Sequence, residues 1–87
     1  MKIPTVHLNG DSYNSLFESH EEAMDTVAVA IHAVGGTAPN GRNFYCQGDD
    51  AFAIETATNE HQDRMRRLRE VYEELQEITI GILNQKR

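Results

Sequence analysis

One stretch constrains the fold of this chain more than any other: residues 35–50, which read GGTAPNGRNFYCQGDD. It contains four of the six glycines, one of the two prolines and the single cysteine. Glycine and proline clusters interrupt regular structure, and on both sides of this stretch apolar residues recur at helical intervals. The stretch therefore predicts a turn between two helices.

The first helix is predicted over residues 11–34. Asp11 and Ser12 are favourable N-cap residues, and Gly35-Gly36 offers a left-handed C-cap at the other end. The apolar face follows spacings of three and four and contains Leu16, His20, Ala23, Met24, Val27, Ile31 and Val34.

The second helix is predicted over residues 51–84, capped by Asp49 or Asp50. Its stripe alternates steps of four and three through Ile54, Thr58, His61, Met65, Leu68, Tyr72, Leu75, Thr79 and Ile82. Opposite charges four residues apart line its outer side as Glu60–Arg64, Asp63–Arg67, Arg66–Glu70 and Arg69–Glu73. These pairs are typical of a solvated helix face.

Residues 2–10 are predicted to be extended, because Pro4 disfavours helix before it and Val6 and Leu8 alternate with polar residues. A single strand cannot form a sheet, so we expect an arm that lies on the helices or pairs with a second copy. The predicted fold class is all-α: an antiparallel two-helix hairpin with an extended N-terminal arm and a long inter-helix loop, completed by oligomerisation.

A hairpin that turns near position 42 would place residues opposite each other when their numbers sum to about 85. His20 would then lie beside Met65, and His61 beside Met24. The longer second helix would extend past the first at its C-terminal end, where exposed apolar side chains indicate an interface. The predicted oligomer interface consists of Ile78, Ile80, Ile82 and Leu83.

With 87 residues the chain is one small domain, and a core of this size is marginal without a partner. The net charge of −6 argues against direct nucleic-acid binding, which needs a basic surface. We find no targeting segment or apolar run of membrane-spanning length, so we expect a cytoplasmic protein that has no contact with membranes.

Catalytic motifs are missing from the sequence. Cys46 would need an oriented base to act as a nucleophile, and no residue pattern places one beside it. His20 and His61 lie on the apolar stripes without a metal-binding spacing, so we expect them to be packed structurally. The chain is predicted not to be an enzyme and to hold no metal and no cofactor.

The long loop remains to be explained, since about fourteen residues exceed the usual helix–helix connection. Arg42 and Tyr45 combine a forked cation with a stacking ring, which suits an anionic, nucleotide-like ligand. The alternative is a hydrophobic plug, with Phe44 and Tyr45 packed over the open end of the hairpin. The candidate ligand-binding residues are His7, Asn9, Asn40, Arg42 and Tyr45.

Two sequence blocks, IPTVHLNG-x-S at residues 3–12 and TAPNGR-x-x-Y at residues 37–45, resemble small uncharacterised proteins of tailed phages and prophages. The resemblance covers nearly the whole chain, although Asn43, Phe44 and Cys46 depart from the related loops. It implies an accessory phage protein made in the bacterial cytoplasm, consistent with interference in host physiology or defence.

Three functions are compatible with these observations. The first is a non-enzymatic binder that sequesters a small anionic ligand at the loop and arm. The second is a protein–protein inhibitor or adaptor that uses acidic or apolar helix faces to bind a host protein, such as one that binds nucleic acid. The third is an assembly component of the virion or its replication machinery.

Overall fold

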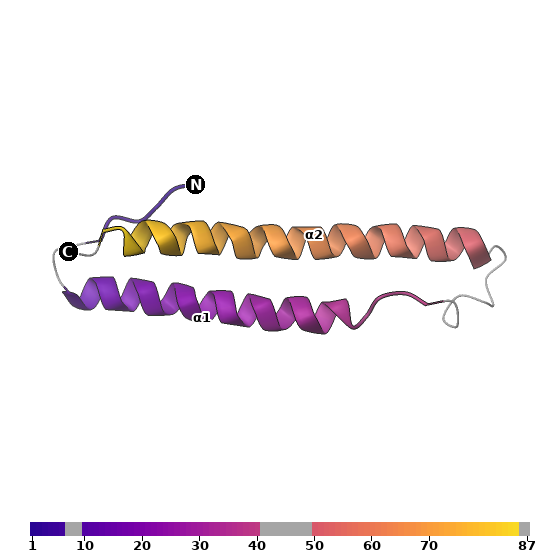
Figure 1. Cartoon of the computed structure of the whole chain (residues 1–87), viewed down its shortest axis with the longest axis horizontal. Coiled ribbons are helices and arrows are strands. Elements are labelled where there is room, and N and C mark those ends of the chain that lie inside the picture. Colours follow the sequence, from indigo (N-terminus) through magenta and orange to yellow (C-terminus); the bar gives the residue numbers. More distant parts are fainter. Residues whose placement is uncertain (7–9, 41–49, 86–87) are drawn as a thin grey trace.

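A computed structural model of the chain describes residues 1–6, 10–40 and 50–85. Within these residues, two helices pack antiparallel: α1 (Gly10–Gly35) and α2 (Asp50–Leu83) (Figure 1). The molecule is a rod of 63 × 20 × 12 Å. The predicted all-helical pair is confirmed, and the side chains of the expected N-cap residues lie outside the described part.

The C-terminal end of α1 differs from the predicted left-handed cap. No described glycine has a positive φ, so neither Gly35 nor Gly36 adopts the left-handed conformation. The last turn of the helix instead has hydrogen bonds between residues three apart, as in a 3₁₀-helix. The Gly36 N–H donates to the Ala33 carbonyl at 3.2 Å, and the Thr37 N–H donates to the Val34 carbonyl at 2.9 Å. The Thr37 hydroxyl also donates to the Val34 carbonyl, at 2.6 Å.

The register between the helices also differs from the prediction. Thr79 Oγ1 lies 3.4 Å from Met24 Sδ, and Met65 Cε lies 3.7 Å from the point where a Cβ on Gly35 would stand. The residue numbers of facing positions therefore sum to 103 and 100, whereas the predicted sum was about 85. The reason is visible in Figure 1: the segment after α1 continues along the rod beside α2 and does not reverse at Gly36.

This register moves the overhang to the other end of α2. The C-terminal end of α2 lies beside the start of α1, whereas the N-terminal end of α2 extends past Gly35 (Figure 1). The prediction that the C-terminal end would overhang is therefore wrong. The predicted proximity of His20 to Met65 and of His61 to Met24 is wrong as well. His20 lies level with positions 80–83 of α2, roughly 30 Å along the axis from His61 at 1.5 Å per residue.

The N-terminal arm lies on the C-terminal end of α2, which was one of its two predicted positions. Gln85 holds it with both ends of its side-chain amide: Oε1 accepts from the Val6 N–H at 2.8 Å, and Nε2 donates to the Pro4 carbonyl at 2.9 Å. In an extended chain these two backbone groups point to the same side, so the amide bonds them as a neighbouring strand would. Ile3 packs directly over Gly81.

The core between the helices is thin. Of the described residues, only Ile82 is fully buried among the hydrophobic ones, and Thr79, 9% exposed, is the buried polar one. The Thr79 hydroxyl donates to the Leu75 carbonyl at 2.7 Å, which satisfies it within its own helix. Most residues facing the other helix are only half-buried, as expected for a pair of helices without a third layer.

Candidate functional site

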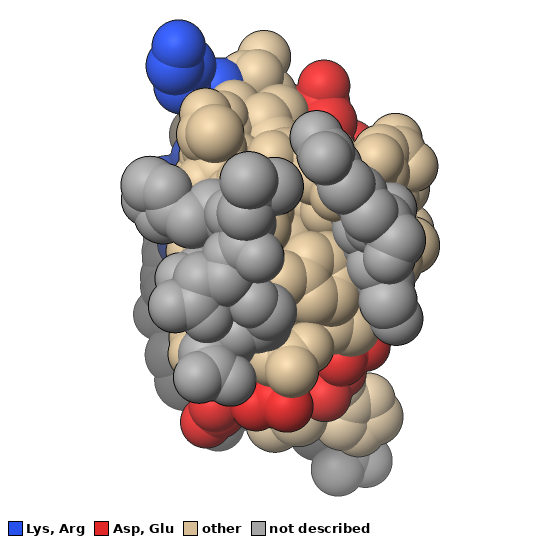
Figure 2. Space-filling model, turned by 90° about the vertical axis from the view of Figure 1, so that its left-hand side faces the viewer, with Lys and Arg blue, Asp and Glu red and all other residues tan. Residues whose placement is uncertain are grey.

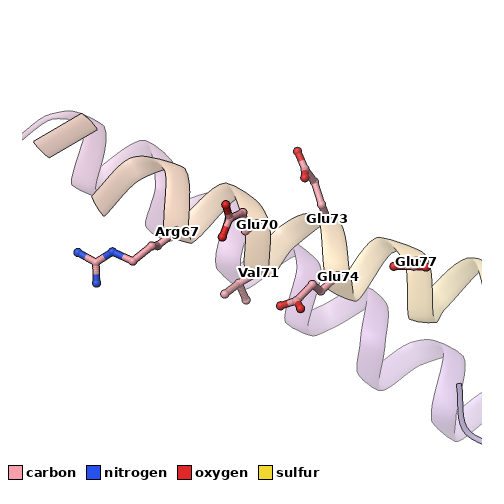
Figure 3. A pocket seen from close by; sticks show the side chains of 6 residues that line it. All are labelled: Arg67, Glu70, Val71, Glu73, Glu74 and Glu77. Atoms are coloured by element: carbon pink, nitrogen blue, oxygen red, sulfur yellow. The ribbon is translucent and has the colours of Figure 1, made fainter. Parts of the chain in front are cut away.

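The most distinctive surface of the described residues is an acidic face on α2. A shallow, open hollow of about 470 Å³ is lined there by Arg67, Glu70, Val71, Glu73, Glu74 and Glu77. All six side chains come from α2, and Glu73 points away from the side that Val71 and Glu74 share (Figure 3). A hollow formed along one helix does not enclose a small molecule, so it is better suited to contact with a broad surface.

Upstream of this face, a short ion-pair ladder organises the positive charges. Asp63 accepts from both Arg66 and Arg67, and Arg66 also donates to Glu70 at 2.6 Å. The hydrogen bond from Arg66 lowers the pKa of Asp63 below its ordinary value, and the positive charges of both arginines act in the same direction. Bonding to Asp63 and Glu70 raises the pKa of Arg66 in turn.

Two of the four predicted ion pairs are therefore present, Asp63–Arg67 and Arg66–Glu70, together with an unpredicted Arg66–Asp63 pair. The structure as described contains no pair between Glu60 and Arg64, or between Arg69 and Glu73. Arg66 and Arg67 both bond to Asp63. Among the acids of the adjoining face, only Glu70 forms an ion pair in the described structure, with Arg66.

The remaining glutamates of the acidic face have no ion pair among the described residues. Four pairs among Glu70, Glu73, Glu74 and Glu77 are three or four positions apart, namely 70–73, 70–74, 73–77 and 74–77. Like charges at these spacings repel one another on a helix. The face thus accumulates negative charge that the hairpin does not neutralise.

The end of the hairpin where the arm meets α2 has a different character. Uncharged side chains fill its centre, and acidic ones gather along its lower margin (Figure 2). Of the predicted interface residues at this end, Ile82 is fully buried within the chain and offers no surface to a partner. Ile78 is half-buried, while Ile80 and Leu83 are 50% and 46% exposed. Ile82 is thus already covered within its own chain, and an oligomer interface at this end stays a prediction.

Most of the predicted ligand-binding residues, His7, Asn9, Arg42 and Tyr45, lie outside the described residues, as does Cys46. Asn40 is described and exposed. Residues 1–6, the described part of the arm, lie at one end of the rod (Figure 1). The described residues on either side of positions 41–49 lie toward the other end. The predicted site at the loop and arm stays a prediction, because four of its five residues lie outside the described part.

The two core histidines are in different environments. His20 Nδ1 lies 2.8 Å from the Leu16 carbonyl, so its ring is held within α1. His61 Nδ1 is buried without a hydrogen-bond partner in the described structure. No group of three or more potential metal ligands occurs among the described residues.

The sequence predicts acidic helix faces only in general terms. The signal for this one was present in EVYEELQE at residues 70–77, where four glutamates fall within eight positions. Helical spacing gathers them on the outer side of α2, but it does not show which arginines remain free to neutralise them. That depends on the side-chain geometry of the ladder.

Comparisons of the chain with protein-family models, with curated proteins and with solved structures give no match. Neither described helix is long and apolar enough to cross a membrane. The acidic face and the arm are therefore interpreted from their own chemistry.

Proposed function

We propose that the chain is a non-catalytic protein-binding module, an inhibitor or adaptor that contacts a basic protein surface through the acidic face of α2. The observation that carries this proposal is the set of glutamates without ion pairs, Glu73, Glu74 and Glu77, beside the single apolar contact Val71. Their negative charge attracts and orients a basic partner, and Val71 supplies an apolar contact at the same surface.

The electrostatic cost of this face supports a role outside the hairpin. Each like-charge pair at these spacings destabilises an isolated helix by about 0.2–0.5 kcal/mol. Glu73, Glu74 and Glu77 gain no compensating ion pair within the described structure. Charge that weakens the fold without an internal partner is well explained by a partner that neutralises it.

The partner we favour is a host protein that ordinarily binds a polyanion such as nucleic acid. A row of carboxylates on a rigid helix presents negative charge to the same lysines and arginines that contact phosphates. The blocks at residues 3–12 and 37–45, similar to those of tailed-phage proteins, support an accessory role in an infected bacterium.

Capture experiments with two matched variants test this proposal. The first variant carries Glu73→Gln, Glu74→Gln and Glu77→Gln on α2. The control carries Glu18→Gln, Glu21→Gln and Glu22→Gln, which removes the same number of exposed charges from α1. We expect the wild type and the α1 variant to retain a stoichiometric bacterial partner and the α2 variant to lose it. Equal capture by both variants would contradict the assignment to α2.

A further inference from the structure

The last ten residues of α1 are unusual because they include no Asp, Glu, Lys or Arg on any side of the helix. Residues 26–35 read TVAVAIHAVG. Val27, Ile31 and Val34 are half-buried, as expected for the side facing α2, whereas Val29 is 70% exposed. Apart from Thr26 and His32 the segment is apolar, and apolar helix surface is normally covered by another element. The outer side of this segment therefore lacks a covering layer.

The accessible surface area of the chain also indicates that part of its surface lacks a covering layer. It exposes 6468 Å², whereas a compact monomer of 9.8 kDa exposes about 5,200 Å². The radius of gyration of 19.1 Å likewise exceeds the roughly 12 Å of a compact chain of this length. Pairing of two copies would cover part of this excess of about 1,300 Å² per chain.

We propose that two copies of this chain pair through residues 26–35 of α1, antiparallel about a two-fold axis near Val29. Every copy carries a net charge of −6, so broad contact between copies would bring like charges together. Residues 26–35 form the part of α1 where two copies meet without that repulsion. A two-fold axis places the same patch on both sides of the interface.

The antiparallel orientation follows from the positions of the acids in α1. About an axis at Val29, a residue k positions before Val29 lies level with the residue k positions after it in the partner. The acid at position 25 then lies level with position 33, which is uncharged, and the acids at positions 18, 21 and 22 lie level with the segment after Gly35. Parallel pairing would instead set each acid beside its own copy.

The same arrangement brings opposite ends of the two rods together. Val29 lies level with positions 71–74 of α2, so Asp50 is about 32–36 Å away along the axis at 1.5 Å per residue. The partner's Gly10 lies about 29 Å from Val29 in the same direction. The beginning of α1 in one copy is therefore at a similar level along the axis to the beginning of α2 in the other, although within one chain they are at opposite ends.

Single-cysteine cross-linking tests both the interface and its orientation. In a Cys46→Ser background, Val29→Cys places a thiol near the axis, and Glu22→Cys places one seven residues away. We expect oxidation to give a disulfide-linked dimer for Val29→Cys and none above background for Glu22→Cys. Efficient linking through Glu22→Cys would overturn the antiparallel orientation, and none through Val29→Cys would overturn the interface.

Sedimentation equilibrium at about 10 µM supplies a second test that needs no new covalent bond. We expect the wild type and Ile80→Asp to sediment as dimers and Val29→Asp to sediment as a 9.8 kDa chain. Ile80 is the matched control, because it is also an exposed aliphatic residue but lies outside residues 26–35. A monomeric wild type, or a monomeric Ile80→Asp with a dimeric Val29→Asp, would overturn the proposal.

Discussion

Gly81 is the residue on which docking of the N-terminal arm depends most directly. A Cβ at this position would lie 2.7 Å from Cγ2 and 2.9 Å from Cδ1 of Ile3, closer than carbon atoms can approach. The glycine therefore provides the space into which the arm packs, inside a helix where alanine would otherwise be preferred.

This geometry predicts a change of sign for one substitution. Gly81→Ala should lower the free energy of unfolding, because the side chain of Ile3 must move off α2 to make room for the Cβ. In an Ile3→Ala background the clash is removed, and the same substitution should raise stability by up to about 1 kcal/mol through helix propensity. Urea denaturation followed by circular dichroism measures both values. Equal stabilisation in the two backgrounds would show that Ile3 does not pack on Gly81.

At the scale of the element, the ion-pair ladder gives α2 a dependence on pH. Hydrogen bonding to Arg66 lowers the pKa of Asp63 in the folded chain. A lowered carboxyl pKa stabilises the fold above the ordinary value of about 3.9, and this contribution is lost as the pH falls through the folded pKa. The ladder therefore stabilises α2 at neutral pH and not in strong acid.

The Asp63→Asn variant isolates this effect. We expect it to melt below the wild type at pH 7 and to match the wild type in strong acid, where the pH is below the lowered folded-state pKa of Asp63 and the carboxyl is protonated in both states. Thermal melts at several pH values measure the difference, with Asp25→Asn as a control for an exposed acid on α1. A difference between wild type and Asp63→Asn that stays constant with pH would contradict the role assigned to the ladder.

The two helices could be predicted from sequence, but their relative position along the axis could not. Apolar spacing determines which side of each helix is buried, and the structure places α1 and α2 within a residue of the predicted bounds. The same spacing repeats at every turn, so it does not determine which turn of α1 faces which turn of α2. The contact between Met24 and Thr79 depends instead on the path of the segment after Gly36.

The candidate site was predictable only in part. The four glutamates at residues 70–77 are evident in the sequence, as is the uncharged run at 26–35. Their significance depends on which contacts the hairpin provides: Arg66 and Arg67 bond to Asp63, and Val29 remains uncovered by α2. Those contacts follow from side-chain geometry and register, which periodicity alone does not specify.

For the whole molecule, the described structure is a thin rod with two unmatched surfaces on different helices. We assign the uncharged run of α1 to a second copy and the acidic face of α2 to a different, basic protein. Because the surfaces are on different helices, we expect a dimer to present two acidic faces. A dimeric partner would then be bound with an enhanced effective concentration.

The most direct test of the account is competition between duplex DNA and the protein captured by the acidic face. If the four glutamates occupy a polyanion-binding surface, a short DNA duplex should displace the wild-type chain from its partner. Displacement would be followed by fluorescence anisotropy of the labelled chain at constant salt, with uncharged dextran at the same mass concentration as the control. The account predicts mutually exclusive binding, and a stable ternary complex of chain, partner and DNA would contradict it.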